Sequence, residues 1–218
     1  FSTGSLKARR VGRPRTAALP GAATRLQYDR AAIAAGELWR ILSGHWTHVS
    51  ADHLFWNVLA FVVLGAIGER SSRVRFYTCL VGSAVVIPVA LWTALPQLRT
   101  YRGLSGIDSA LFALLAVTLM KDVIHARRWT WVTGLSAVFL AFIGKVGFEM
   151  ATGRTIFVDS TAAHMLPVPL AHCIGAVVGV IVGMTGYCTT RCAEPRSLGS
   201  VAQGLEDFTS SALMRTDR

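Results

Sequence analysis

The chain has 218 residues, of which 52% are apolar and 16% charged, and its mean hydropathy is +0.47. Soluble domains carry charges on about a quarter of their residues, so this composition excludes an ordinary soluble protein and favours one embedded in a lipid bilayer. The net charge of +10 would suggest a nucleic-acid partner in a soluble protein, but the basic residues lie mostly between and outside apolar runs. Basic residues in these places set the orientation of membrane proteins, so we expect the bilayer, and no nucleic acid, as a partner.

The sequence divides into three segments. Residues 1–25 are basic and contain Pro and Gly without the apolar core of a signal peptide, so we expect a disordered N-terminal segment. Residues 26–188 hold the apolar runs and form the predicted membrane domain. Residues 189–218 mix charges with Ser and Gly without apolar periodicity, which predicts a C-terminal tail of low order.

Residues 26–50 come before the first apolar run and combine aromatic and aliphatic side chains with Arg40 and polar turns. Trp39 and Trp46 are of the residue type that gathers at the boundary between lipid and water. We therefore expect this segment to be an interfacial loop lying in the outer leaflet.

Five apolar runs follow in the predicted membrane domain. A spanning helix takes about 20 residues, and each run reaches that length, the first and third with help from flanking residues. The runs are residues 53–68, 76–96, 104–120, 129–148 and 168–187. The predicted fold class is all-α, a polytopic membrane helix bundle with five visible transmembrane helices.

The loops between the runs carry unequal charge. Residues 69–75 and 121–128 each contain three Lys/Arg, and the other two loops contain fewer. Short loops rich in Lys and Arg face the cytoplasm, so we expect residues 1–50 outside and the C-terminal tail in the cytosol. A basic segment does not cross a membrane readily without a preceding span, so we expect a transmembrane helix upstream of residue 26.

The cysteines give no framework for disulfides or zinc. Two lie within apolar runs, and two form a Cys-x-x-x-Cys pattern in the tail without nearby histidines. They are Cys79, Cys173, Cys188 and Cys192.

Polar residues inside apolar spans are costly, and each one marks a candidate functional site. His53 and Asn57 are four residues apart, so both side chains lie on one face of a helix near its outer end. Both can donate hydrogen bonds to one point. Taken alone, such a pair is more typical of residues that tie neighbouring helices together.

The third run opens with Gly103-Leu104-Ser105-Gly106. The glycines allow close approach of the backbone, and Ser105 lies in the first turn of the predicted helix, where free N–H groups can stabilise an oxyanion. Taken alone, the motif is more typical of helix packing or of a simple helix start.

His172 lies in the fifth run, and glycines follow it at a spacing of four residues from Gly175 to Gly179 and Gly183. Such a stripe lets helices pack tightly, which could bring the imidazole to a serine hydroxyl. A single histidine in this setting is more often a hydrogen-bonded interior residue. The predicted topology, however, places His172 at the same membrane surface as Ser105.

From residue 26 to about residue 184 the chain resembles the rhomboid intramembrane serine proteases, because several motifs occur in the family's order. These are Glu37-Leu38-Trp39-Arg40 for the loop signature, His48 and His53-x-x-x-Asn57 for the second-helix start, Gly103-Leu104-Ser105-Gly106 for the nucleophile and Ala171-His172-x-x-Gly175 for the base. The segments LQYDRAAIAAGELWR, YRGLSG and VPLAHCIGAVVG are most similar to rhombosortases. That branch is thought to process bacterial surface proteins with a Gly-Gly-containing C-terminal anchor.

The resemblance implies an intramembrane endopeptidase that acts on membrane-anchored protein substrates without a metal or other cofactor. Ser105 would be the nucleophile and His172 the base, and His53, Asn57 and the Ser105 backbone N–H would hold the oxyanion. Supporting roles are implied for Glu37, Trp39, Arg40, His48, Gly103, Gly106, Gly175 and Gly179. The natural substrate, the cleavage position and the oligomeric state are left open.

Two features depart from the family pattern. The family has a helix before the position of Leu26 that this chain does not show, and Asp108 occupies a position that is usually apolar. A buried Asp108 would need a partner, which could be the site or a polar neighbour.

Three other classes of protein were compared with this interpretation. A catalytically inactive rhomboid-like protein that binds or escorts membrane clients would need neither Ser105 nor His172. A metalloprotease could use His45, His48 and His53, but these lack a His-Glu-x-x-His frame. A transporter would favour internal repeats and a broken helix, and the sequence indicates neither.

Overall fold

The computed structural model describes residues 20–152 and 168–185. Most of the predicted N-terminal segment and all of the predicted C-terminal tail lie outside these residues. The elements, in chain order, are α1 (Pro20–Leu26), β1 (Tyr28–Asp29), α2 (Arg30–Ala34), α3 (Arg40–Ser43), the 3-10 turn η1 (Gly44–Trp46), α4 (Ala51–Ser71), α5 (Arg73–Ala94), β2 (Thr100–Tyr101), α6 (Ser105–His125), α7 (Trp129–Thr152) and α8 (Pro169–Met184). Helix α1 therefore begins inside the segment that the sequence predicts to be disordered.

The five long helices α4 to α8 correspond to the five apolar runs, so the described part of the chain is mainly helical. Three of them, α4, α5 and α7, are long and apolar enough to cross a membrane. Helix α6 has 21 residues but carries Asp108, Lys121 and Asp122, and α8 has only 16 residues. A membrane crossing by α6 and α8 therefore stays a proposal.

Serine caps set where the first two long helices begin. The Ser50 side chain accepts a hydrogen bond from the backbone N–H of His53, and the Ser72 side chain accepts one from Arg75. Such caps satisfy N–H groups that the first helical turn leaves free. The Ser50 cap starts α4 two residues before the predicted run, and this places His53 in the first turn.

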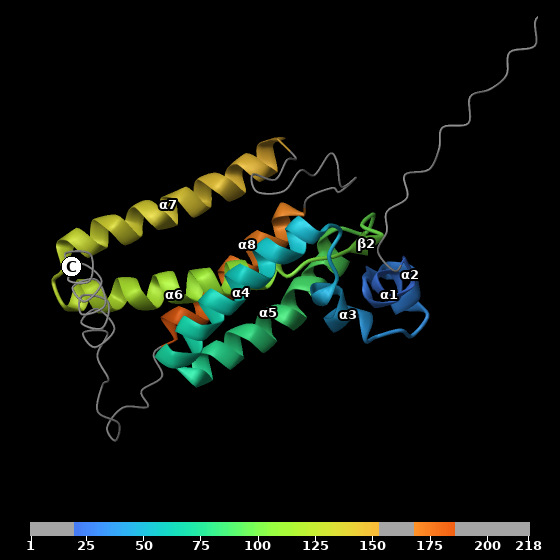
Figure 1. Ribbon diagram of the computed structural model, residues 1–218, viewed down its shortest axis with the longest axis horizontal. Coiled ribbons are helices and arrows are strands. Elements are labelled where there is room, and N and C mark those ends of the chain that lie inside the picture. Colours follow the sequence, from blue (N-terminus) through green and yellow to red (C-terminus); the bar gives the residue numbers. More distant parts are fainter. Residues whose placement is uncertain (1–19, 153–167, 186–218) are drawn as a thin grey trace, which may run out of the picture. The chain divides into compact units, whose positions relative to one another are not determined.

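Helix α6 forms the centre of the bundle and packs against α4, α5 and α8 (Figure 1). Its contact with α8 is the closest, because a Cβ atom on Gly175 would overlap the carbonyl oxygen of Gly106. The predicted tight packing of the glycine stripe is thus a contact between α8 and α6, in which the backbones meet without intervening side chains.

Helix α7 is the least covered of the long helices. It contacts α6 through the rings of Phe112 and Phe142, whose centroids are 4.7 Å apart. Near its C-terminal end it also contacts α8, where the Cys173 thiol lies 3.9 Å from the sulfur of Met150. These contacts help to hold α7 against the bundle while most of its surface faces outward.

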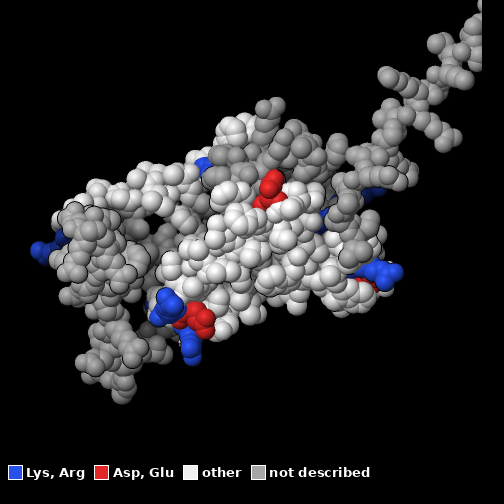
Figure 2. Space-filling model, in the orientation of Figure 1, with Lys and Arg blue, Asp and Glu red and all other residues white. Residues whose placement is uncertain are grey.

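The outer surfaces of the long helices are apolar. Val62 on α4, Val81 on α5 and Leu140 on α7 have exposed fractions of 57%, 61% and 65%. On the face drawn in Figure 2, charged side chains form small clusters near the helix ends, and the surface between them is uncharged. A soluble monomer rarely exposes so large an apolar surface, so the chain is an integral membrane protein.

The segment before α4 is joined to the loop before α6. Strands β1 and β2 pair antiparallel, with Tyr28 opposite Tyr101 and Asp29 opposite Thr100. This pairing fixes the loop that leads into Ser105. In the segment before α4, at residues 26–50, four large apolar side chains are exposed, as expected for an interfacial loop. They are Leu38, Trp39, Leu42 and Trp46.

Candidate active site

Ser105 is the first residue of α6 and follows a sharply bent loop. Gly103 has a φ of 126°, which L side chains rarely adopt, and a Cβ atom there would lie 3.1 Å from Cε1 of His53. The Gly103 N–H donates to the carbonyl of Gly44, and its own carbonyl accepts from the Tyr101 hydroxyl. The loop is thus fixed on both sides, and Gly103 leaves room for His53 beside Ser105.

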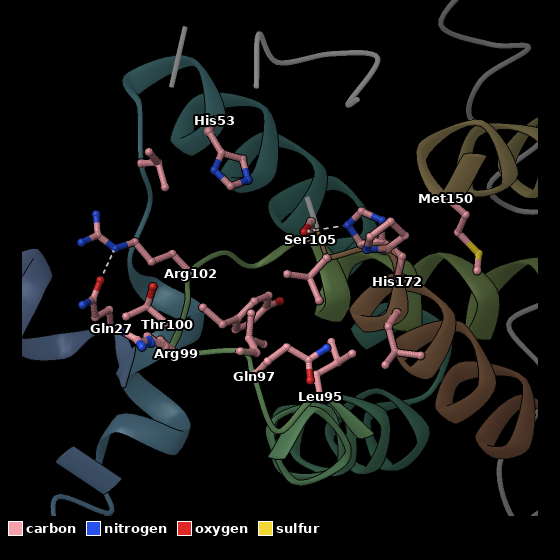
Figure 3. A pocket seen from close by; sticks show the side chains of 16 residues that line it. Gln27, His53, Leu95, Gln97, Arg99, Thr100, Arg102, Ser105, Met150 and His172 are labelled. Carbon is pink, nitrogen blue, oxygen red and sulfur yellow. Dashed lines mark hydrogen bonds between the residues drawn. The ribbon is translucent and has the colours of Figure 1, made fainter. Parts of the chain in front are cut away.

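The Ser105 hydroxyl and the His172 imidazole are in hydrogen-bond contact, with 2.9 Å between Oγ and Nε2 (Figure 3). His172 lies in the first turn of α8 and is 7% exposed. The contact depends on the close approach of α8 to α6 at Gly175. The distance lies in the range that a nucleophile and its general base need.

The other nitrogen of His172 has a partner that the sequence analysis did not identify. Nδ1 lies 3.0 Å from Oε2 of Glu149, and Oε1 of Glu149 lies 2.7 Å from Nζ of Lys145. Glu149 is 1% exposed, while the Lys145 side chain is 26% exposed. The sequence did contain a clue to this contact, because Lys145 and Glu149 are the charged residues of α7 and charged residues within apolar spans mark functional sites.

His53 and Asn57 lie on one face of α4, and both are buried, with exposed fractions of 8% and 9%. Nδ1 of His53 and the amide nitrogen of Asn57 have no hydrogen-bond partner within the described ranges. A buried nitrogen without a partner is rare in proteins, and donors that await a ligand are one explanation. His53 also lines the pocket at Ser105, whereas Asn57 does not.

The pocket at Ser105 has a volume of about 890 Å³. Figure 3 shows Arg99 and Arg102 on one side of Ser105, and His172 and Met150 on the other. Arg102 donates from Nε to the side-chain oxygen of Gln27 at 2.6 Å. The serine hydroxyl is therefore reached through a pocket lined by both polar and apolar side chains rather than sealed in the bundle.

The predicted supporting residues before α4 build the loop beside the site. Arg40 is 8% exposed, and it donates to Glu37 at 2.6 Å and to the carbonyls of Thr24 and Gln27. Trp39, by contrast, is 56% exposed. Arg40 and Glu37 thus tie α3 to the preceding turns, while Trp39 contributes to the outward apolar surface.

Two histidines of this loop are held neutral. Burial and the charge of nearby His53 lower the pKa of His48 to about 4, and the His48 ring packs edge-on against that of His53 at 5.1 Å. Burial also lowers the pKa of His45, whose Nε2 lies 3.0 Å from the carbonyl oxygen of Ala84. His48 thus supports the His53 ring, and His45 links the loop to α5.

Asp108 is 9% exposed, and neither of its carboxylate oxygens has a hydrogen-bond partner among residues 20–152 and 168–185. The partner that burial would require is therefore not found within that part of the chain. We have no physical account of this residue.

A pocket that reaches a hydrogen-bonded serine and histidine inside a bundle of apolar helices defines a membrane protein that carries the residue types serine hydrolases use. The model of the Rhomboid domain matches residues 35–188, which is more than half of the chain, and the chain belongs to the rhomboid family. This family consists of intramembrane serine proteases. None of the curated proteins compared with the chain matches it.

Proposed function

We propose that the protein is an intramembrane serine endopeptidase in which Ser105 is the nucleophile and His172 is the general base. The observation that carries this proposal is the 2.9 Å contact between Ser105 Oγ and His172 Nε2 at the pocket. Membership of the rhomboid family supports the reaction type.

The reaction proceeds in two stages. The Ser105 oxygen attacks a peptide carbonyl as His172 takes the hydroxyl proton, and the peptide C–N bond then breaks while His172 gives this proton to the leaving amine. The product is an acyl-enzyme and a free amino terminus. Water then attacks the ester, again with its proton passing to His172, and releases the new carboxyl terminus and the Ser105 hydroxyl.

His53, Asn57 and the backbone N–H of Ser105 would donate to the oxyanion that forms in each stage. The buried, unpartnered nitrogens of His53 and Asn57 support this role, because fixed donors in a site of low dielectric stabilise developing negative charge strongly. The position of Ser105 at the start of α6 adds free N–H groups and the positive end of the helix dipole.

The substrates would be membrane-anchored proteins. The resemblance to rhombosortases favours cleavage near a Gly-Gly-containing C-terminal anchor, in a bacterial inner membrane with the C-terminal tail of the enzyme in the cytosol. Five crossings by α4 to α8 would then place Ser105 near the outer surface.

Ser105→Ala tests the nucleophile directly. The purified chain in detergent should cleave a Gly-Gly-anchored membrane substrate, and a fluorophosphonate probe should label it, whereas Ser105→Ala should show neither reaction. Ser109→Ala is a matched control, because Ser109 lies one turn further along α6 and its hydroxyl donates to the Ser105 carbonyl at 2.8 Å. This control should keep labelling.

Undiminished cleavage by pure Ser105→Ala protein would exclude covalent serine catalysis at this position. A parent chain that binds the substrate without cleaving it and takes up no probe would instead favour the inactive escort protein. Equal melting temperatures of the variants are needed for the comparison, since each hydroxyl also contributes to helix packing.

A further inference from the structure

Helix α7 carries two charged residues in an otherwise uncharged sequence: Glu149 contacts His172 of the candidate active site, and Lys145 contacts Glu149. Burying Glu149 at 1% exposure removes a carboxylate from water, which is unfavourable unless hydrogen bonds and an opposite charge compensate. Lys145 supplies the charge at 2.7 Å, and His172 supplies the second hydrogen bond at 3.0 Å. Both carboxylate oxygens are therefore occupied.

We propose that Glu149 is a positioning residue that completes a Ser105–His172–Glu149 triad, and that Lys145 orients its carboxylate. The proposal rests on the proposed function and extends it, because a serine–histidine pair alone leaves the imidazole free to take either tautomer. Its basis is the chain of contacts from Lys145 through Glu149 and His172 to Ser105.

The chemistry follows from which atoms carry protons. An ionised carboxylate only accepts hydrogen bonds, so the Nδ1 atom of His172 that faces it must carry a proton. The Nε2 atom is then unprotonated and can accept the Ser105 proton. The same carboxylate stabilises the imidazolium that forms when the proton is transferred, as the acidic residue does in soluble serine hydrolases.

Lys145 determines what a neutral substitute at position 149 can do. In Glu149→Gln the ammonium group of Lys145 can only donate, so the amide oxygen must turn toward it. The amide NH₂ group then faces Nδ1 of His172 and donates to it. His172 is forced into the tautomer with a proton on Nε2, which cannot accept the proton of Ser105.

We expect Glu149→Gln to lower kcat by about 10⁴-fold with little change in KM, because a serine protease held in the wrong tautomer loses about this much. Glu149→Asp keeps the carboxylate and should be more active than Glu149→Gln. Lys145→Met leaves the carboxylate facing His172 and should lose about 10- to 100-fold, as the loss of an outer contact does, and so less than Glu149→Gln.

The double variant separates positioning from helix packing. In Glu149→Gln with Lys145→Met the amide is free to flip and present its oxygen to Nδ1, so the useful tautomer becomes accessible again. We expect about a 10-fold gain or more over Glu149→Gln alone. If the two residues only tie α7 to α8, the double variant will be no better than the single one.

The tautomer of His172 can be measured by NMR without a catalytic assay. In the full chain with ¹⁵N-labelled histidine, the two ring nitrogens of His172 have different chemical shifts according to which one is protonated, and His172→Gln identifies the signals. We expect the proton on Nδ1 in the parent chain and in Lys145→Met, and on Nε2 in Glu149→Gln.

These measurements distinguish two kinds of failure. If the probe does not label Ser105 but His172 carries its proton on Nδ1 only when Glu149 is present, the positioning role holds and the protease function is wrong. The opposite failure requires a parent chain that cleaves substrate. The triad is then wrong, and the Ser105–His172 pair acts alone, if folded Glu149→Gln keeps the kcat and the His172 tautomer of the parent. The same conclusion follows if the double variant is no more active than Glu149→Gln.

Discussion

Asn57 and His53 act at one point of the proposed mechanism, one helical turn apart on α4. Neither contacts Ser105 through a hydrogen bond in the described structure, and each has a buried nitrogen without a partner. Such donors contribute most when negative charge appears beside them, and little before that. Their substitution should therefore affect the rate of reaction much more than the stability of the fold.

We expect Asn57→Ala to reduce kcat by about 10- to 1,000-fold, because His53 and the Ser105 N–H still donate to the oxyanion. The melting temperature should change little, because the amide nitrogen of Asn57 has no hydrogen-bond partner to lose within the described residues. Steady-state cleavage of the Gly-Gly substrate and thermal unfolding in the same detergent measure both effects. Unchanged kcat with full stability would remove Asn57 from the oxyanion site.

Sequence patterns at the residue scale identified polar groups near the site but not all of their contacts. Ser105 and His172 stood out because their motifs occur in the family's order. Lys145 and Glu149 were visible as charges in an apolar run, but nothing in the run shows which way α7 is rotated. The residue that faces Nδ1 of His172 could therefore not be predicted.

At the scale of elements, the contact between α6 and α8 carries the Ser105–His172 geometry. The stripe of small residues on α8 meets the backbone of α6, and a Cβ on Gly175 or Gly179 would overlap the carbonyl of Gly106 or Ala110. The sequence predicted that α8 packs closely on a neighbour. It could not identify the neighbour, since α5 also packs on α8.

The same substitution at two glycines should have opposite effects. Gly175→Ala pushes α8 away from α6 and should destabilise the fold by about 1–3 kcal/mol, as overpacked sites do, and slow labelling of Ser105. Gly134→Ala on α7 meets no atom within 4 Å and should keep or raise the melting temperature, because Ala is the better helix former. Equal melting temperatures for the two variants would contradict the close contact.

At the scale of the whole molecule, consecutive long helices connect opposite ends of the described bundle. The starts of α4, α6 and α8 provide His53, Ser105 and His172 to one pocket. The turn between α4 and α5, at Ser72, therefore lies at the other end. The sequence predicted this alternation from the apolar runs and the basic loops. Which end of the bundle faces the cytoplasm is inferred only from the charge of those loops.

We expect Arg73 on the cytoplasmic side and Thr100 on the outer side of the membrane, because the basic turn at residues 69–75 resists translocation. Both are exposed, so single cysteines at these positions should react fully with a maleimide when they face it. In a variant without the native cysteines that still takes up the fluorophosphonate probe, an impermeant maleimide should label Thr100→Cys in intact cells and Arg73→Cys only after the membrane is opened. Labelling of both positions from the same side would overturn the alternating arrangement. Labelling of Arg73→Cys alone in intact cells would keep the arrangement but reverse its direction, and would place the proposed active site at the cytoplasmic surface.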